Sequence, residues 1–350
     1  LNYKIMTKKL KVGVIGLGSM GSTHLDIYAQ LSNVEVIAIA DSIQSRLDGS
    51  SKAEGNISGQ AEGGVTGLNV KKYLDGMDLI NNPDIDAVDI CVGTDLHFIF
   101  VEAALAKNKH VLVEKPLART YDEAKKIIQL AKQHSSCHVM SAMCLRYWPA
   151  WVFLKEAIEN NAYGKCLSLN FKRQTSFPGG AFYSDSNQCG GALLDLHVHD
   201  TDFINCCLGL PDAVFSQGYK GPSGDFDHVV TNYIFNKNND SPLVSSEGSW
   251  TMQEGYGFNM SYTANFENGT LSYLLDEDET LKLFVSGSDP EVINLKEGMG
   301  YEFEIRTFVA EILSGNKTNF ALLQQAAKTI AIIEAERKSI EKCSIEPVKT

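Results

Sequence analysis

The sequence predicts two parts: an α/β domain built on a doubly wound parallel sheet, followed by an α+β domain built on a large, mostly antiparallel open sheet with helices. In the first 145 residues, short apolar runs alternate with helical segments, as in a parallel sheet covered on both faces. A glycine-rich turn follows the first apolar run. Beyond about residue 150, long strand-like segments dominate. We therefore expect domains at residues 1–145 and 146–350.

The first strand–helix–strand unit gives the clearest pattern. Residues 11–16 form an apolar run with β-branched side chains that ends in glycine, which predicts a buried strand. A helix is expected over residues 20–31 and a second strand over residues 34–40, where Asp41 ends the apolar run. Two strands joined by a helix in this way must pair in parallel.

The pattern weakens between residues 48 and 69. Six glycines are scattered there among serine, asparagine, glutamate and glutamine. Such a composition buries too little apolar surface to order itself. We interpret this stretch as a flexible surface insertion, and the alternative is a lid over a functional site.

Regular alternation then resumes. Further strands of the first domain are expected at residues 87–92, 110–113 and 138–140, with helices at 98–108 and 121–134. A helix at 151–159 opens the second domain, and two helices at 301–313 and 320–341 close it. Its predicted strands are at residues 166–174, 229–236, 244–252, 259–266 and 270–275. The pair Asn268-Gly269 separates the last two strands and is a hairpin signal.

Composition excludes several classes of partner. The 350 residues are 44% hydrophobic and 21% charged, close to the globular average. The net charge of −12 leaves no basic footprint for nucleic acid. The apolar runs fall short of the ~20 residues that span a bilayer. We expect neither a nucleic-acid nor a membrane partner.

Cysteine usage bears on the compartment. None of the eight cysteines forms a C-x-x-C motif, and several lie in apolar segments. This usage is typical of a reducing compartment, where a free cysteine packs as a small apolar residue. We expect a cytoplasmic protein. The adjacent Cys206 and Cys207 are interpreted as part of a buried helix face rather than as a redox or metal pair.

The turn at residues 16–21 reads G-L-G-S-M-G, the G-x-G-x-x-G pattern of dinucleotide sites. Its context fits, because it follows a predicted strand and opens a predicted helix. The first glycine permits the tight turn, the second lets a pyrophosphate approach the backbone, and the third lets the helix pack on the strand. The helix start offers N–H groups to the phosphates. The expected contacts in this turn are Gly16, Gly18, Ser19, Met20 and Gly21.

Asp41 stands 20 residues after the last glycine of this turn, at the end of the second predicted strand. A carboxylate there accepts hydrogen bonds from ribose hydroxyls and repels a 2′-phosphate. The sequence therefore favours NAD over NADP as the cofactor. Arg46, five residues further on, would soften that preference.

Two further segments follow predicted strands and therefore border the ligand crevice of such a sheet. Thr94 and His97 come after the third strand and are candidates for cofactor contact, although a helix N-cap at Thr94 or Asp95 is an equal interpretation. Glu114 and Lys115 precede a proline after the next strand. From these residues alone, a surface turn is the better interpretation of Lys115.

The segment at residues 190–202 is dense in titratable groups. If it is helical, Asp195, His199 and Asp202 share one face, and a carboxylate beside a histidine supports a general base. If it is extended, His197 and His199 share a face and resemble an H-x-H metal pair. We favour acid–base chemistry over a structural cluster. A metal site is the least favoured interpretation, because no further ligands are evident.

Four residues are candidates for substrate contact. Arg146 and Trp148 fall where the two domains join, although core packing is the better interpretation of Trp148. Arg173 lies on a predicted strand of the second domain. His197 completes this group.

Taken together, these motifs resemble the glucose–fructose oxidoreductase / inositol dehydrogenase family (Gfo/Idh/MocA). The resemblance covers nearly the whole chain. It rests on the G-L-G-S-M-G turn, N-P-D-I-D-A-V at residues 82–88, E-K-P at 114–116, L-R-Y-W-P at 145–149, and G-G leading into D-x-x-x-H-x-x-D at 190–202.

The resemblance implies a Rossmann domain that binds NAD(P) and an enzyme that moves hydride to or from a sugar, cyclitol or related polyol. It implies that Lys115, Asp195 and His199 form the catalytic set. In that picture His199 takes the hydroxyl proton, Lys115 hydrogen-bonds the same oxygen, and Asp195 orients these groups or the substrate. The peptide bond before Pro116 is often cis in this family. A homodimer or homotetramer is also implied.

The sequence departs from the family pattern at three places. The family often has T-P-x-x-x-H after its third strand, where this chain has G-T-D-L-H at residues 93–97. His197 stands where the family often has glycine, and the insertion at 48–69 is long.

Two other functions remain open: an NAD-dependent glycosidase with no net redox change, and a non-catalytic NAD-binding sensor.

Overall fold

The structure is a computed structural model that describes residues 9–51, 65, 68–235, 241–275 and 280–350. The chain divides into two compact units. Unit 1 comprises Leu1–Leu117, Lys125–Ala142 and Tyr301–Leu323. Unit 2 comprises Ala118–Ala124, Met143–Gly300 and Gln324–Thr350. Most of the predicted insertion, at residues 52–64, 66 and 67, lies outside the described residues.

A six-stranded parallel sheet forms the centre of unit 1, which confirms the doubly wound α/β prediction. Its strands follow the order β3-β2-β1-β4-β5-β6. They are β1 (Leu10–Ile15), β2 (Val34–Ala40), β3 (Lys71–Tyr73), β4 (Ala87–Ile90), β5 (His110–Glu114) and β6 (Val139–Ala142). The strand order reverses between β1 and β4. The carboxyl ends of these two strands therefore border the crevice in which such sheets bind ligands.

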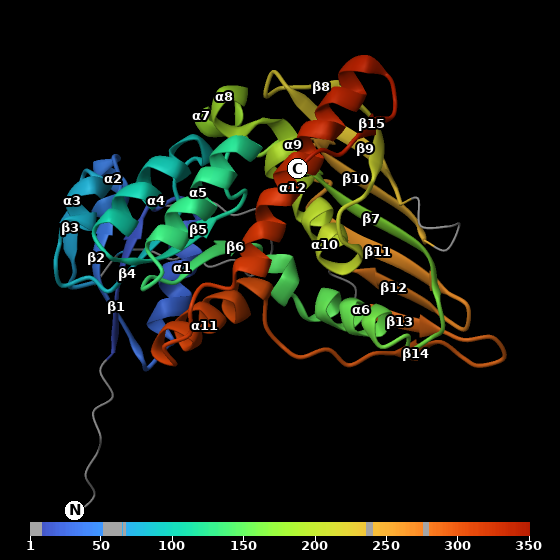
Figure 1. Cartoon of the computed structure of the whole chain (residues 1–350), viewed down its shortest axis with the longest axis horizontal. Helices are drawn as coiled ribbons and strands as arrows, with labels where there is room; N and C mark the ends of the chain where they lie inside the picture. Colours follow the sequence, from blue (N-terminus) through green and yellow to red (C-terminus); the bar gives the residue numbers. More distant parts are fainter. Residues whose placement is uncertain (1–8, 52–64, 66–67, 236–240, 276–279) are drawn as a thin grey trace, which may run out of the picture. The chain divides into compact units, whose positions relative to one another are not determined.

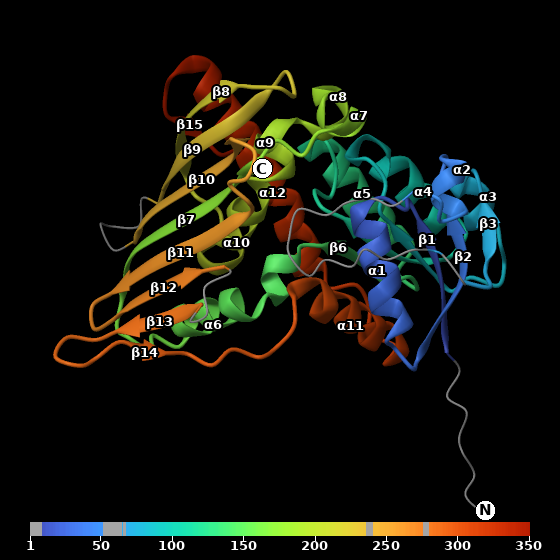
Figure 2. The same cartoon turned by 180° about the vertical axis from the view of Figure 1, so that it is seen from behind.

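Helices cover both faces of this sheet. They are α1 (Ser19–Ala29), α2 (Gln44–Leu47), α3 (Gly76–Ile80), α4 (His97–Ala106), α5 (Tyr121–Gln133) and α11 (Gly300–Leu313), with a 3₁₀ helix η1 (Thr94–Leu96). Figure 1 shows α4 and α5 over one face, and Figure 2, seen from behind, shows α1 over the other. No helix within the described residues is long and apolar enough to cross a membrane.

Burial explains why the sequence forms these strands. All four residues of β4 are buried, and so are five of the six residues of β1. Strands that are covered on both faces need such continuous apolar runs. The edge strand β3 and the short helix α3 were not predicted. β3 has only three residues, and the two lysines among them are exposed, so it carries no apolar pattern.

A nine-stranded sheet forms unit 2, in the order β14-β13-β12-β11-β7-β10-β9-β8-β15. Only the pair β7–β10 is parallel among its described pairings, which confirms the mostly antiparallel prediction. The strands are β7 (Cys166–Ser176), β8 (Ala213–Lys220), β9 (Phe226–Ile234), β10 (Leu243–Met252), β11 (Asn259–Phe266), β12 (Thr270–Leu274), β13 (Leu281–Phe284), β14 (Glu291–Val292) and β15 (Glu346–Pro347).

The longer helices of unit 2 pack on one face of its sheet. Side chains alternate between buried and less buried along β7 and β9, as expected for a sheet packed on one face. Figure 1 shows α6, α10 and α12 along that face. The helices are α6 (Pro149–Glu159), α7 (Gly180–Tyr183), α8 (Ser186–Cys189), α9 (Gly191–Asp195), α10 (Val198–Leu208) and α12 (Phe320–Lys342), with a 3₁₀ helix η2 (Cys144–Tyr147).

An aromatic cluster joins α6 and α10 to the sheet. Trp151 is fully buried and meets the rings of Phe203, Tyr262 and Tyr273 edge-on, with ring centroids 5.0–6.4 Å apart. The hydroxyl of Tyr262 donates a 2.9 Å hydrogen bond to the carbonyl oxygen of Ala150. Edge-to-face pairs add to the stability that burial provides. This cluster fixes α10, which carries the titratable segment identified in the sequence.

Candidate active site

The turn between β1 and α1 leaves open space at only one of its three motif glycines. Gly16 has φ +90°, and a Cβ atom there would lie 2.4 Å from the carbonyl oxygen of Cys91. A Cβ atom at Gly21 would lie 1.8 Å from the carbonyl oxygen of Gly16. A Cβ atom at Gly18 would meet no described atom within 4 Å. Gly16 and Gly21 therefore serve the packing of the protein itself, whereas the space beside Gly18 fits a pyrophosphate.

The start of α1 complements that space. Its N-cap residue is Gly18, which has no side chain to satisfy the first N–H groups of the helix. Ser19 and Met20 begin the first turn, which contains no acidic residue. These N–H groups and the positive end of the helix dipole favour an anion. The residues of the turn thus fit the pyrophosphate of NAD.

Asp41 follows β2 and is held in a defined orientation. Its carboxylate accepts hydrogen bonds from the backbone N–H groups of Leu17, at 2.7 Å, and Ile43, at 2.8 Å. The Nη1 atom of Arg46 lies 3.3 Å from the same carboxylate. Only 3% of the Asp41 side chain is exposed, against 36% for Arg46. Asp41 is therefore anchored next to the glycine turn, and Arg46 partly offsets its charge. An effect of Arg46 on the preference for NAD stays a prediction.

His97 is buried behind the turn that follows β5. Its Nδ1 atom lies 2.8 Å from the carbonyl oxygen of Pro116, and Nε2 lies 3.2 Å from that of Val92. Burial outweighs both carbonyl contacts and lowers the pKa of His97, so the ring is neutral. A neutral imidazole donates one hydrogen bond, which we assign to Pro116 because that contact is shorter. These contacts make His97 a support of the turn, and its contact with a cofactor stays a prediction.

Thr94 begins η1 and is buried. The N-cap interpretation of Thr94 or Asp95 is wrong. The N-cap residues of η1 and α4 are Gly93 and Leu96, and neither makes a side-chain capping hydrogen bond. The chain enters α4 through a 3₁₀ turn, which the propensity of threonine and aspartate for N-cap positions does not reveal. A cofactor contact at Thr94 stays a prediction.

Lys115 directly follows β5, at the carboxyl edge of the parallel sheet. Its backbone N–H donates a 2.9 Å hydrogen bond to Oε2 of Glu114. The peptide bond between Lys115 and Pro116 is cis, as the resemblance implies. His97 contacts the carbonyl oxygen of Pro116, and Glu114 accepts the N–H of Lys115. The turn is therefore fixed on both sides of Lys115. These contacts order the turn around Lys115, and a catalytic or cofactor-binding role of Lys115 stays a prediction.

The titratable segment of unit 2 is helical but interrupted. α9 ends at Asp195 and α10 begins at Val198, with a turn between them, so the extended H-x-H interpretation is wrong. His199 and Asp202 lie on α10, whereas Asp195 closes the preceding helix. The three residues therefore do not share the face of one continuous helix. His199 is 9% exposed, and its Nδ1 atom lies 3.8 Å from Sγ of Cys144.

Both candidate arginines of unit 2 form buried ion pairs with α10. Arg146 binds Asp202 through Nε, at 2.8 Å, and Nη2, at 2.7 Å. Burial alone would lower the pKa of Arg146, but the neighbouring carboxylate of Asp202 raises it by more. The pKa of Arg146 is therefore above its ordinary value, and the charge persists. Arg173 binds Asp200 through two nitrogens, both at 3.0 Å. These pairs fix α10, and a substrate contact of either arginine stays a prediction.

The other two substrate candidates are also enclosed. His197 is fully buried, with Nε2 3.2 Å from the hydroxyl of Tyr233 and 3.5 Å from a carboxylate oxygen of Glu336. Trp148 is 6% exposed and packs edge-on against Trp151. These contacts favour structural roles, as the sequence already indicated for Trp148. Their contact with a substrate stays a prediction.

Comparison with protein families identifies the chain. Residues 10–142 match the oxidoreductase family with an NAD-binding Rossmann fold, and residues 151–272 match the carboxyl-terminal domain of the same family. The chain belongs to the GFO/IDH/MocA oxidoreductase family. The resemblance drawn from the motifs is thereby confirmed, and so is the assignment of unit 1 as an NAD-binding fold.

Relatives of this GFO/IDH/MocA protein include proteins named inositol dehydrogenases. Myo-inositol 2-dehydrogenase of Thermotoga maritima is 29% identical over 63% of this chain and 64% of its own length. Inositol 2-dehydrogenase of Salmonella paratyphi B is 32% identical over 57% of this chain and 54% of its own length. Among solved structures, levoglucosan dehydrogenase in complex with NADH and levoglucosan has a TM-score of 0.82 at 21% identity, covering 98% of this chain and 100% of that one. This last likeness concerns the fold.

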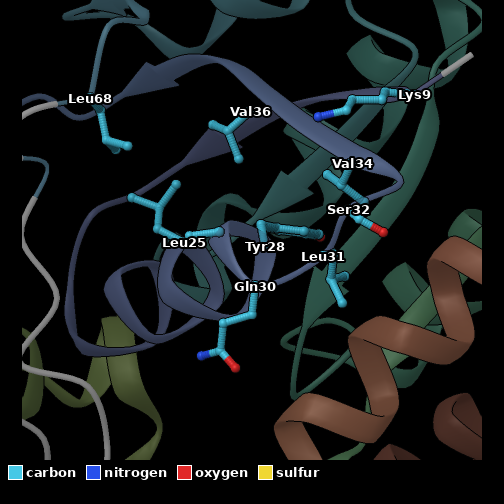
Figure 3. Close-up of a pocket in the computed structure, with 10 residues that line it drawn as sticks. Lys9, Leu25, Tyr28, Gln30, Leu31, Ser32, Val34, Val36 and Leu68 are labelled. Carbon is cyan, nitrogen blue, oxygen red and sulfur yellow. The ribbon is translucent and has the colours of Figure 1, made fainter. Parts of the chain in front are cut away.

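Two surface hollows of unit 1 lie away from the dinucleotide turn. The first is lined by residues of α1 and by Lys9, Val34 and Val36 at the starts of β1 and β2 (Figure 3). The second includes Leu10 and His110, at the starts of β1 and β5. Both lie at the amino ends of the strands. Ligands of open parallel sheets bind at the opposite edge, so we assign neither hollow to the cofactor.

The sequence reasoning missed one group of buried polar residues in unit 1. His24 on α1 contacts Asp89 of β4 and Glu114 of β5. A signal was present in the sequence. His24 lies three residues after Gly21 and four before Tyr28, so all three share the face of α1 that packs on the sheet. A histidine on such a face requires polar partners beneath it.

Proposed function

We propose that this protein is an NAD-dependent dehydrogenase that acts on a hydroxyl-bearing carbon of a cyclitol, sugar or related polyol. One observation carries the proposal: open space beside Gly18, at the start of α1, next to an anchored Asp41 carboxylate. This arrangement suits an unphosphorylated ribose and a pyrophosphate together. The names of sequence relatives, inositol 2-dehydrogenase and levoglucosan dehydrogenase, support the substrate class.

NAD supplies a hydride acceptor when it is bound. The residues of the chain then have to bind the hydroxyl group and take up its proton. We assign that proton to the imidazole of His199. The ammonium group of Lys115 hydrogen-bonds the same oxygen and stabilises its developing charge, and Asp195 orients the reacting groups. The main contribution of the protein is to hold these groups in place, because fixed geometry replaces the entropy cost of an encounter.

An initial-rate assay tests the proposed function. NADH formation at 340 nm is measured with NAD or NADP and a panel of inositols, aldoses and anhydro-sugars. We expect one polyol to be oxidised, and faster with NAD than with NADP. No turnover across the panel, with NADH still bound, would favour the redox-neutral glycosidase or the sensor instead.

Substitution of the proposed acid–base groups tests their roles. We expect Lys115→Ala and His199→Ala each to lower kcat by ~100-fold or more, because each removes a positioned proton-transfer or charge-stabilising group. The Kd for NADH, measured by fluorescence, should change little. Turnover at the wild-type rate in either variant would refute its assignment.

A further inference from the structure

A buried polar cluster connects α1 to the ends of β4 and β5 within unit 1. Nδ1 of His24 lies 2.8 Å from Oδ2 of Asp89, and Nε2 lies 3.3 Å from Oε1 of Glu114. The side chains of His24 and Asp89 are fully buried, and that of Glu114 is 7% exposed. The cluster adjoins the dinucleotide turn, because a Cβ atom at Gly21 would lie 3.5 Å from Cβ of Cys91, which contacts His24.

The surroundings of His24 favour its charged form. Nδ1 of His24 hydrogen-bonds Asp89, whereas Nε2 meets Glu114 as an ion-pair contact at 3.3 Å without a hydrogen bond. A carboxylate beside each ring nitrogen stabilises the doubly protonated imidazole. Burial lowers the pKa of His24, but Asp89 and Cys91 raise it, and the result is a pKa well above 6.5. Burial and Asp89 raise the pKa of the Cys91 thiol, which is therefore neutral. Burial and Asp89 likewise keep the hydroxyl of Tyr28 protonated by raising its pKa. The cluster is thus an imidazolium between two carboxylates.

Glu114 extends this cluster to Lys115. One carboxylate oxygen of Glu114 faces His24, and the other accepts the backbone N–H of Lys115 at 2.9 Å. A change in the orientation of the Glu114 carboxylate would therefore release the Lys115 backbone. Within the described residues, the ring of His97 hydrogen-bonds the carbonyl groups of Pro116 and Val92 rather than the carboxylate of Glu114.

We propose that His24 is a positioning residue for Lys115: as an imidazolium between Asp89 and Glu114, it fixes the carboxylate that holds the Lys115 backbone. The inference rests on the proposed function, in which Lys115 bonds the reacting oxygen. His24 also belongs to the helix whose first turn suits the cofactor phosphates. One helix thus carries both the phosphate-binding end and the support of Lys115.

A metal ion is the competing occupant of this cluster. Nδ1 of His24, a carboxylate oxygen of Asp89 and Sγ of Cys91 lie within 4.8 Å of one another. Two nitrogen or oxygen ligands of a tetrahedral zinc ion stand about 3.4 Å apart. The 2.8 Å separation of Nδ1 and Oδ2 is the length of a hydrogen bond. The geometry therefore favours a shared proton over a metal.

The first test uses His24→Asn, which keeps a neutral donor near Asp89 and removes the contact with Glu114. The matched control is His138→Asn. His138 is also buried in unit 1 and pairs with Glu311 at 2.9 Å, but it precedes β6. The acetylation rate of each lysine is followed by mass spectrometry in the substrate-free protein. We expect the rate at Lys115 to change several-fold in His24→Asn alone, with the other lysines unaffected. An unchanged rate at Lys115 would overturn the proposal.

Kinetics then tests whether His24 acts through Glu114. We expect His24→Asn to lower kcat about 10- to 100-fold, because small misplacements of a reacting group have effects of this size. The Kd for NADH should stay within about twofold if only the transition state is affected. In a double-mutant cycle with Glu114→Gln, the two losses should be strongly non-additive. Additive losses would contradict a shared pathway.

Two further measurements keep the outcomes distinguishable. If the wild type oxidises no polyol, the proposed function fails, and the substrate-free acetylation experiment still decides the role of His24. If His24→Asn does not fold, ¹⁵N NMR of the wild-type histidines decides. We expect a doubly protonated His24 at pH 7.5, and a neutral ring would refute the proposal. Stoichiometric zinc in the purified protein, bound by His24, would refute it equally.

Discussion

At the scale of single residues, the partners of a side chain decide its charge and its task. Two buried histidines of unit 1 illustrate this. Among the described residues, the ring of His97 hydrogen-bonds two backbone carbonyl groups, and burial lowers its pKa. His24 meets two carboxylates, and its pKa is raised despite complete burial. The sequence could flag His97, because it follows a predicted strand. It could not show these opposite charge states, because the carboxylates that meet His24 lie on β4 and β5, far from it in the sequence.

The lowered pKa of His97 predicts a dependence of stability on pH. The ring is neutral in the folded protein and gains a proton in the unfolded chain below about pH 6.5. The contribution of His97 to the free energy of unfolding is therefore present above about pH 6.5 and is lost as the pH falls through the folded pKa. We expect His97→Leu to lose more stability at pH 8 than at pH 5.5, measured by urea unfolding. A larger loss at pH 5.5 would contradict a neutral ring.

The anchored carboxylate of Asp41 predicts the choice of cofactor. Asp41→Asn keeps an acceptor for only one of the N–H groups of Leu17 and Ile43, which bind different carboxylate oxygens, and it removes the charge that repels a 2′-phosphate. We expect the ratio of kcat/KM for NAD to that for NADP to fall about tenfold or more, since like-charge contacts cost several kcal/mol. Arg46→Ala serves as the opposite control and should raise that ratio. An unchanged ratio in Asp41→Asn would show that the carboxylate does not face the ribose.

At the scale of elements, continuous apolar runs predicted the buried strands well, and β2 has the predicted bounds. Elements with weaker patterns were missed, among them the edge strand β3 and the strands β8 and β13. The break between α9 and α10 was missed too, because Leu196 and His197 are compatible with a helix. Such ends are set by tertiary packing. The partners of α10, Arg146 and Arg173, are 56 and 27 positions from Asp202 and Asp200, beyond the reach of local patterns.

The glycine turn yields a prediction with a built-in control. Gly21→Ala would place a methyl group against the carbonyl oxygen of Gly16, and overpacking of this kind costs about 1–3 kcal/mol or more. The methyl group of Gly18→Ala would meet no described atom, and Gly18 has a φ of −70°, which alanine adopts readily. We therefore expect unchanged thermal stability in this variant. Its methyl group would occupy the space for the pyrophosphate and weaken NADH binding about tenfold or more, or ~1.4 kcal/mol. Undiminished NADH binding by Gly18→Ala would place the cofactor elsewhere.

At the scale of the whole molecule, the order of motifs along the chain predicted the fold class and the family, which the comparisons confirm. The substrate is a different matter. Arg146, Arg173 and His197 were singled out by residue type and position, and the structure gives each of them a buried partner within unit 2. Specificity depends on side chains brought together by the fold, and residue type alone does not separate a substrate ligand from an internal ion pair.

The central claim is that this member of the GFO/IDH/MocA family carries out net oxidation with NAD. The most direct test is the amount of NADH formed for each mole of polyol consumed by the wild-type protein. We predict one mole of NADH per mole of polyol, with a ketone product in equal amount. Consumption of substrate without accumulation of NADH would contradict net oxidation and indicate a redox-neutral reaction.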